Sequence, residues 1–470
     1  MDYTNSRSMK LLHLLGLADT YRRQPDAVSE TTEFTSVFVT GFRPKEEGDK
    51  ELGSWRVESV VEQKAESRRV NDGSFPAEHG QRCSQVVFEN WMRDVFGKID
   101  SVDFRVGWEY TGHGEDGKGG QVRAFFNDEN GQKREIVGAY LVGCDGGRSR
   151  VREAAGIPYR PPYGSNNEHN SPTRFYLVDF RSAQLAQSRP FGRFWHVFPV
   201  GNGFIIDQDD QDTFTAHYIA IDSILVHGRW QPSFRIVDSY ISDGGRVLLA
   251  GDAAHRTPPP GGYGMNSGIV DAFDLGWRFA AMVKGYGGPL LLTSYSLERR
   301  RSMIQALLRS HRHVMEHLGL EELCAKNEHL LKSDTVEGKA DFGLELDLRY
   351  DFSPCVVPDG SPALLWDVNR YAPSTRPGSR APRVILKGRE HVGRIWERSL
   401  VLVRPDAHVV WRGNKAPESW EARQIVMVAS GRTTAPGYQK PTSNEDEERF
   451  TKTMAAFGIK SSDGERAFQL

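Results

Sequence analysis

The segment from Arg246 to Gly268, RVLLAGDAAHRTPPPGGYGMNSG, most constrains the fold of this chain. It opens with the apolar run Val247 to Ala250, which is typical of a buried strand in a parallel sheet. A glycine, an aspartate and a loop rich in proline and glycine then lead into a predicted helix, with Asn266 or Ser267 as its cap. Ligands bind at the carboxyl ends of strands in open α/β sheets, so Asp252 is predicted to point into a ligand crevice.

A second segment, AYLVGCDGGRSRVREAAGI at 139–157, repeats this order of strand, turn and short helix. The turn is predicted at Asp145-Gly146-Gly147. Ser149 is expected to cap the helix, and Gly156 is expected to end it. The sequence therefore predicts two strands of one sheet, each followed by an aspartate in a turn.

The two segments resemble the GD and DG motifs of FAD-dependent aromatic hydroxylases, the class A flavoprotein monooxygenases, and they occur in that family's order. The resemblance implies an α/β fold with an FAD-binding domain like that of p-hydroxybenzoate hydroxylase and a mixed β-sheet substrate domain. It also implies that Asp252 binds the ribityl hydroxyls of FAD. Gly264, Met265 and Asn266 would lie beside the pyrimidine edge of the flavin.

The same resemblance points to five further residues. Asp145 and Gly146 would help hold the pyrophosphate region of FAD. Arg7, in the segment NSRSM, matches an arginine that reaches FAD, and Asp2 matches in spacing the active-site aspartate of phenol-hydroxylase-like members. Gln85 resembles a flavin-contacting glutamine at a helix start, with a capping or solvent-facing amide as the open alternative.

The chain departs from the family pattern at both ends. Members open with a strand, turn and helix carrying G-x-G-x-x-G, and nothing precedes Met1 here, so we expect a shortened start. A literal match at 112–117 lies between two alternating runs, which predicts a hairpin tip rather than a phosphate loop. Members also carry a thioredoxin-like domain between segments that match Gly378–Pro382 and Val401–Asp406. So few residues separate these here that only a remnant is expected.

These patterns predict the following organisation. The units are a first part of the FAD-binding domain over 1–165, in which 30–80 contributes to the substrate sheet, a substrate domain over 166–237, a second part of the FAD-binding domain over 238–340, a thioredoxin-like remnant over 341–430 and a polar tail over 431–470. A β-meander is expected within 102–142, and strands of the substrate sheet near 32–40, 175–180 and 191–200.

The resemblance implies that NAD(P)H reduces FAD and that a hydroperoxide formed with O2 hydroxylates a phenolic or other aromatic small molecule, such as a polyketide-type secondary metabolite. Arg148 or Arg152 could meet the phosphate of the nicotinamide cofactor. The alternative is a truncated, inactive flavoprotein fragment that acts at most as a binding protein. A flavin halogenase would need a W-x-W-x-I-P segment, which none of the ten tryptophans forms.

Composition excludes other classes. A net charge of −2 gives no electrostatic case for nucleic acid binding, and no apolar stretch predicts a membrane span or a signal peptide. Four scattered cysteines indicate reduced thiols and a cytoplasmic protein, in which a homodimer is left open. No metal site is predicted, since His311, His313 and His317 have no acidic or cysteine partner nearby in sequence.

Three expectations concern structural side chains. His255 is expected to be a hydrogen-bonded structural residue rather than a base. The leucines between Leu11 and Leu17 are expected to face the core from one amphipathic helix. The arginines of the helix that begins near Arg299 are expected to form its solvated face, namely Arg299, Arg300, Arg301, Arg309 and Arg312.

Overall fold

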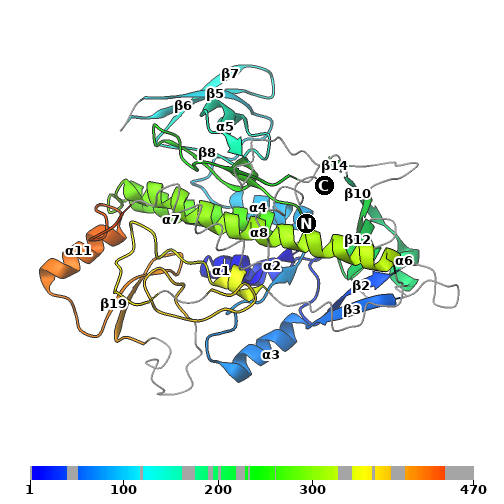
Figure 1. The fold of residues 1–470 in the computed structure, drawn as a ribbon. Helices are drawn as coiled ribbons and strands as arrows, with labels where there is room; N and C mark the ends of the chain where they lie inside the picture. The colour runs from blue at the N-terminus through cyan, green and yellow to red at the C-terminus, as the bar shows by residue number, and fades with distance from the viewer. Residues whose placement is uncertain are drawn as a thin grey trace.

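The computed structural model describes residues 3–39, 51–116, 120–160, 175–188, 194–198, 203–218, 228–230, 233–259, 261–326, 341–362, 366–382 and 397–439. Two long helices, α7 (Tyr263–Val283) and α8 (Leu290–Lys326), pack on each other and cross the middle of the molecule (Figure 1). A large sheet lies at one end of these helices and a β-hairpin at the other. Among the described residues, no helix is both long enough and apolar enough to span a bilayer.

The large sheet has seven strands, and all its neighbours are antiparallel except β11 and β2. Their order is β14 (Gly228–Trp230), β10 (Phe175–Arg181), β13 (Thr213–Tyr218), β12 (Gly203–Asp207), β11 (Phe194–Phe198), β2 (Phe34–Val39) and β3 (Glu51–Val57). The segments near 32–40, 175–180 and 191–200 thus share one sheet, as their alternating sequences predict. Val37, Ile205 and Phe214 are buried on it.

The two motif strands form a parallel pair in the centre of the fold. β8 (Leu141–Gly143) lies beside β16 (Val247–Leu249), with Gly143 opposite Leu249, and β16 is fully buried. The short helix α5 (Arg150–Ala154) follows β8. Its N-cap is Ser149, and Gly156 takes a positive φ just after its end. The predicted order of strand, turn and helix is therefore confirmed.

The predicted β-meander is present, but its first strand starts later than expected. It comprises β5 (Glu109–Glu115), β6 (Val122–Asn127) and β7 (Lys133–Gly138), whereas 102–108 is not strand. Residues 112–115 of the literal G-x-G-x-x-G match lie inside β5, so this match does not open a helix. Its last residue lies outside the described part of the chain. A small sheet of β17 (His255–Arg256), β15 (Arg235–Val237) and β9 (Tyr159–Arg160) adjoins the motif strands.

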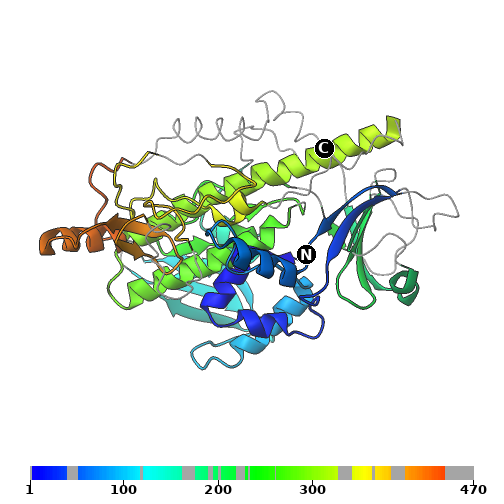
Figure 2. The same cartoon turned by 90° about the horizontal axis from the view of Figure 1, so that it is seen from below.

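The N-terminal residues form β1 (Tyr3–Thr4), α1 (Ser6–Leu14) and α2 (Ala18–Arg22), and β1 pairs with β4 (Gln81–Arg82). Leu11 and Leu12 are buried, but Leu14 and Leu15 are 49% and 58% exposed. The expectation of a uniformly buried leucine run was therefore wrong. The helix ends at Leu14, and its last turn extends past the core formed by Met9, Leu12, Ala18, Tyr21, Cys83 and Trp91. Helices α3 (Val60–Val70) and α4 (Gln85–Phe96) follow (Figure 2).

The arginines of α8 do not form one solvated face. Arg299 is 2% exposed and its Nε donates to Asp271 at 2.7 Å, while Arg309 is 8% exposed and pairs with Asp341 at 2.8 Å. Successive helical residues point about 100° apart, so three consecutive arginines cannot all face water when a helix is covered on several sides. The carboxylates of Asp271 on α7 and of Asp341 compensate the buried guanidinium groups.

The described residues beyond Asp341 form α9 (Phe342–Leu346), the hairpin of β18 (Leu400–Val403) and β19 (Val409–Gly413), and α11 (Ser419–Ala429). α6 (Ala183–Ser188) lies beside the large sheet. Whether 341–430 derives from a thioredoxin-like domain stays a prediction, and the polar tail is described only as far as residue 439.

Candidate cofactor site

The turn after β16 rests directly on the first turns of α7. It forms a short 3-10 helix, Gly251–Ala253, and a Cβ added at Gly268 would lie 3.4 Å from the Cα of Gly251. The backbone N–H of Gly251 donates to Asp271 Oδ2 at 3.0 Å. His255 Nε2 lies 2.8 Å from the same oxygen and is fully buried, as expected of a structural histidine. Burial alone would raise the pKa of Asp271, but Arg299 and His255 lower it, so the carboxylate is ionised.

Helix α7 begins earlier than predicted, and its cap is not Asn266 or Ser267. The N-cap is Gly262, whose φ of +66° an L-residue would adopt only with strain. Asn266 lies in the first turn, where its Oδ1 accepts from Asn5 N at 2.9 Å and from Ser8 Oγ at 2.7 Å. Its Nδ2 donates to the carbonyls of Tyr3 and Gly262. Asn266 therefore joins the starts of α1 and α7, which explains why it does not cap its own helix.

Arg7 lies at this junction with most of its hydrogen-bonding capacity unused. Its side chain is buried, and Nη2 donates to the backbone carbonyl of Asp406 at 3.0 Å. Nε and Nη1 have no hydrogen-bond partner among the described residues. Burial lowers the pKa of Arg7 from its usual value, yet an arginine stays charged in proteins. A buried cation with unsatisfied donors is costly, so this guanidinium is suited to an acceptor from a ligand.

These residues line a cavity that is open to solvent. The first turns of α1 and α7 both contribute to it, so two positive helix ends favour an anionic or electron-rich group there. Its lining comprises Asn5, Arg7, Tyr263, Asn266, Ser267, Val270, Arg299, Ser302, Ala306, Leu344, Glu345 and Leu348.

Glu345 is the acid of this cavity. Its Oε2 accepts from the backbone N–H of Ser6 at 3.3 Å. Burial and the nearby charge of Asp341 raise the pKa of Glu345 to about 8, so its carboxyl group is largely protonated at neutral pH. Asp341 itself is held ionised, because Arg309 and His313 contact it and offset the effect of burial. The cavity therefore contains an uncharged carboxyl near a charged guanidinium.

The turn after β8 lies beside the turn after β16, because the two strands are parallel and in register at Gly143 and Leu249. Asp145 is exposed, although Ser149 Oγ donates to its Oδ1 at 2.5 Å and Val151 N to its Oδ2 at 3.1 Å. Gly146 takes a φ of +78° in this turn. Asp252 is also exposed, and its backbone carbonyl accepts from Tyr159 at 2.7 Å. Two aspartates thus stand at the same edge of the sheet.

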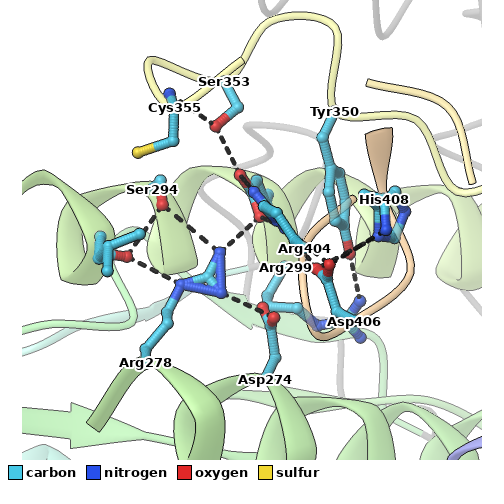
Figure 3. Close-up of polar contacts among 12 residues, drawn as sticks. Asp274, Arg278, Ser294, Arg299, Tyr350, Ser353, Cys355, Arg404, Asp406 and His408 are labelled. Carbon is cyan, nitrogen blue, oxygen red and sulfur yellow. Dashed lines mark hydrogen bonds and ion pairs between the residues drawn. The ribbon is translucent and has the colours of Figure 1, made fainter. Parts of the chain in front are cut away.

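A buried charge network lies between α7, α8 and the β18–β19 hairpin (Figure 3). Arg278 donates to Asp274 at 2.7 Å and to Glu298 at 2.6 Å, and Arg404 donates to Glu298 at 2.8 Å through both terminal nitrogens. Arg404 also pairs with Asp406. The carboxylate oxygens of Asp274, Glu298 and Asp406 lie within 4.8 Å of one another. We assign no metal there, because Arg278 and Arg404 already pair with the three carboxylates.

Two predicted site residues do not join this cluster. Gln85, the first residue of α4, is exposed and donates to Glu89 at 2.7 Å, which matches the solvent-facing alternative. Asp2 lies outside the described residues. The cavity instead includes Arg299 and Glu345, which sequence reasoning missed. The run of three arginines could have indicated Arg299, since at least one of them must turn inward on a packed helix.

Several known proteins are similar to this chain. A family model described as the FAD binding domain matches residues 2–310. The FAD-dependent monooxygenase apdD of Emericella nidulans is 30% identical over 92% of this chain and 84% of its own length. The 2,4-dichlorophenol 6-monooxygenase of Cupriavidus pinatubonensis is 26% identical over 81% of this chain and 71% of its own. The flavin-dependent monooxygenase PieE, solved with FAD and substrate, is 20% identical with a TM-score of 0.73, covering 91% of both chains.

Proposed function

Because this chain belongs to the FAD-dependent aromatic hydroxylase family and is an FAD-dependent monooxygenase, we propose that it uses NAD(P)H and O2 to hydroxylate a phenolic or other aromatic small molecule. The single observation that carries the proposed cofactor site is Arg7. Its buried guanidinium has two nitrogens, Nε and Nη1, without a partner among the described residues, at a cavity between two helix starts. A flavin pyrimidine edge, which carries carbonyl acceptors and gains negative charge on reduction, fits that environment.

The proposed cofactor contacts follow from two places in the fold. One is the meeting point of the starts of α1 and α7, and the other is the pair of turns after β8 and β16. Arg7 and the first turn of α7, with Gly264, Met265 and Asn266, would hold the flavin ring. Asp252 would bind the ribityl hydroxyls, and Asp145 with Gly146 would face the pyrophosphate region, because both turns lie at the carboxyl edge of the β8–β16 pair. Gln85 and Asp2 stay predictions of a flavin contact and an active-site acid.

Of the two arginines proposed for the nicotinamide phosphate, Arg148 is the better candidate. Arg148 is exposed. Arg152 is 8% exposed, its guanidinium lies over the ring of Tyr159, and it donates to Glu153 at 3.1 Å. A guanidinium already used in packing is less available to an incoming phosphate. We therefore propose that Arg148 contributes to binding of the reduced nicotinamide cofactor.

When bound, FAD supplies the transfer of electrons to O2 and of one oxygen atom to the ring of the substrate. The chain has four proposed tasks around it. Apolar side chains of the cavity, Val270, Ala306, Leu344 and Leu348, would exclude water. The carboxyl group of Glu345 would hold a proton, and Arg7 would stabilise negative charge. Asp2 is proposed to assist deprotonation of a phenol.

A catalytically inactive fragment is the alternative. Similarity to a named monooxygenase over 92% of this chain favours the enzyme. The test is to purify the full chain, record its visible flavin spectrum with and without added FAD, and follow NADPH and NADH oxidation with a panel of phenols. A flavin spectrum, phenol-dependent oxidation and a product heavier by one oxygen would support the proposal. A protein that cannot be loaded with FAD would overturn it.

A further inference from the structure

We infer that Arg404 and Asp406, in the turn of the β18–β19 hairpin, are positioning residues that orient the Arg7 guanidinium in the cofactor cavity. The inference rests on the proposed role of Arg7 toward FAD. It extends that role to a segment of the chain for which no contact with the flavin is proposed. The hairpin turn lies 399 residues from Arg7 along the chain and meets it through one hydrogen bond.

The carbonyl of Asp406 is the hydrogen-bond partner of the Arg7 side chain among the described residues, and Nη2 of Arg7 donates to it at 3.0 Å. A guanidinium is planar and its donors have a fixed geometry. Fixing one terminal nitrogen therefore limits the directions in which Nε and Nη1 can point. Where those two donors lie in the cavity depends on where the Asp406 carbonyl lies.

The hairpin turn holds that carbonyl in place. Arg404 N donates to His408 O at 2.8 Å, Ala407 N donates to Arg404 O at 2.9 Å, and Ala407 takes a φ of +66°. The carboxylate of Asp406 accepts from Arg404 Nε at 3.1 Å and from His408 N at 3.2 Å. Arg404, Asp406 and His408 of this turn are buried, so water does not compete for the hydrogen bonds among them, although Pro405 is exposed.

Arg404 then anchors the turn to the core helices (Figure 3). Both of its terminal nitrogens donate to Glu298 of α8, and Glu298 also accepts from Arg278 of α7. Burial would raise the pKa of Glu298, but Arg404 and Arg278 lower it, so the anchor is a charged one. A continuous series of contacts therefore connects α7 and α8, through Glu298 and Arg404, with the Asp406 carbonyl and Arg7.

A double-mutant cycle on FAD affinity tests this series of contacts in the full chain. We expect Arg404→Gln to weaken FAD binding about tenfold, the size of one charged hydrogen bond, because Arg7 loses its orientation. In an Arg7→Met background the same change should have no further effect. An equal loss in both backgrounds would mean that Arg404 acts without Arg7, and it would overturn the inference.

The matched control is Arg412→Gln. Arg412 lies in β19 of the same hairpin, is similarly buried, and contacts the two carboxylates of Asp359 and Glu397. We expect it to leave FAD affinity unchanged. If Arg404→Gln does not fold, Asp406→Asn serves instead. This substitution keeps the shape of the side chain and the backbone carbonyl but removes the negative charge that pairs with Arg404. We expect a smaller loss of FAD affinity than for Arg404→Gln, and no loss in the Arg7→Met background.

A second readout does not depend on FAD. Phenylglyoxal modifies accessible arginines, and the rate at Arg7 can be followed by peptide mass spectrometry on the FAD-free protein. Arg404→Gln or Asp406→Asn should raise the labelling rate of Arg7 severalfold, while Arg412→Gln should not. If the chain takes up no FAD, the proposed function fails, and this rate still decides the inference. An unchanged Arg7 rate in both turn variants would overturn it.

Discussion

The side-chain amide oxygen of Asn266 accepts a 2.7 Å hydrogen bond from the hydroxyl of Ser8, and this contact fastens the first turn of α7 to the first turn of α1. Asn266 also accepts from Asn5 N and donates to two carbonyls, so all its polar atoms are used inside the protein. The geometry of the cavity depends on this residue, because both helix starts line it.

Asn266→Ala is expected to destabilise the protein by about 2–4 kcal/mol, since it leaves several buried groups without partners. Urea denaturation monitored by far-UV circular dichroism measures this. Asn266→Asp keeps the acceptor but loses both donors, so it should be intermediate. Equal stability of Asn266→Ala and the natural protein would show that the junction contributes nothing.

Arg7→Met should weaken FAD binding at least about tenfold, because a charged donor to the ligand is lost. The stability of the FAD-free protein should change little, since two donors of Arg7 are unpartnered among the described residues. Fluorescence titration with FAD gives the affinity. Arg22→Met is a fitting control, as Arg22 is also buried but pairs with Glu78 in the N-terminal region. A similar loss in both variants would argue against a direct role of Arg7.

Glu345 should make the protein less stable as pH rises. In the folded chain its pKa is about 8, against an ordinary value of 4.5, so the folded state keeps a proton that the unfolded state releases between these limits. The stability contributed by this group is present below about 4.5 and is lost as pH approaches about 8. Glu345→Gln should flatten that part of the stability profile measured by urea denaturation. An unchanged slope would mean that Glu345 is already ionised in the folded protein.

Arg278→Met should destabilise the fold by about 3–5 kcal/mol, because it leaves Asp274 and Glu298 buried with too little positive charge. Burial already raises the pKa of Asp274 to about 6, so the loss should be smaller in mild acid, where this carboxyl can be protonated. Arg56→Met is the comparison, since Arg56 pairs with Glu33 and Glu62 on the surface and should change stability little. Chemical denaturation of both variants distinguishes a buried network from a surface pair.

The central motif was predictable because its signals are local. A buried strand, a glycine turn and a helix follow one another within 246–283, and the same order at 139–157 gives β8 and α5. Neighbouring residues alone determine such elements. Three strands of the large sheet, β2, β10 and β11, and most of the meander were also visible as alternating runs.

The cavity was only partly predictable, because its residues meet through tertiary contacts. Asn266 was expected to cap α7, but the N-terminal segment uses its amide instead. Arg299 and Arg309 were expected in water, but carboxylates on other elements draw them inward. Glu345 belongs to a stretch without a motif. Burial and the charge of Asp341 raise its pKa, although the contact with Ser6 lowers it, and α9 is covered by α1 only in the folded chain. Sequence periodicity cannot reveal partners that lie hundreds of residues away.

The hydrogen bond between Arg7 and Asp406 also sets an order of events during synthesis. Arg7 leaves the ribosome among the first residues of this sequence, whereas its carbonyl partner is added 399 residues later. Asn266 can join the start of α1 once it has been made, but the carbonyl that holds the Arg7 side chain is added only with the hairpin turn. A nascent chain can therefore form the strands and helices that precede the hairpin first, but a cofactor pocket with an oriented arginine is complete only after the hairpin turn has been made.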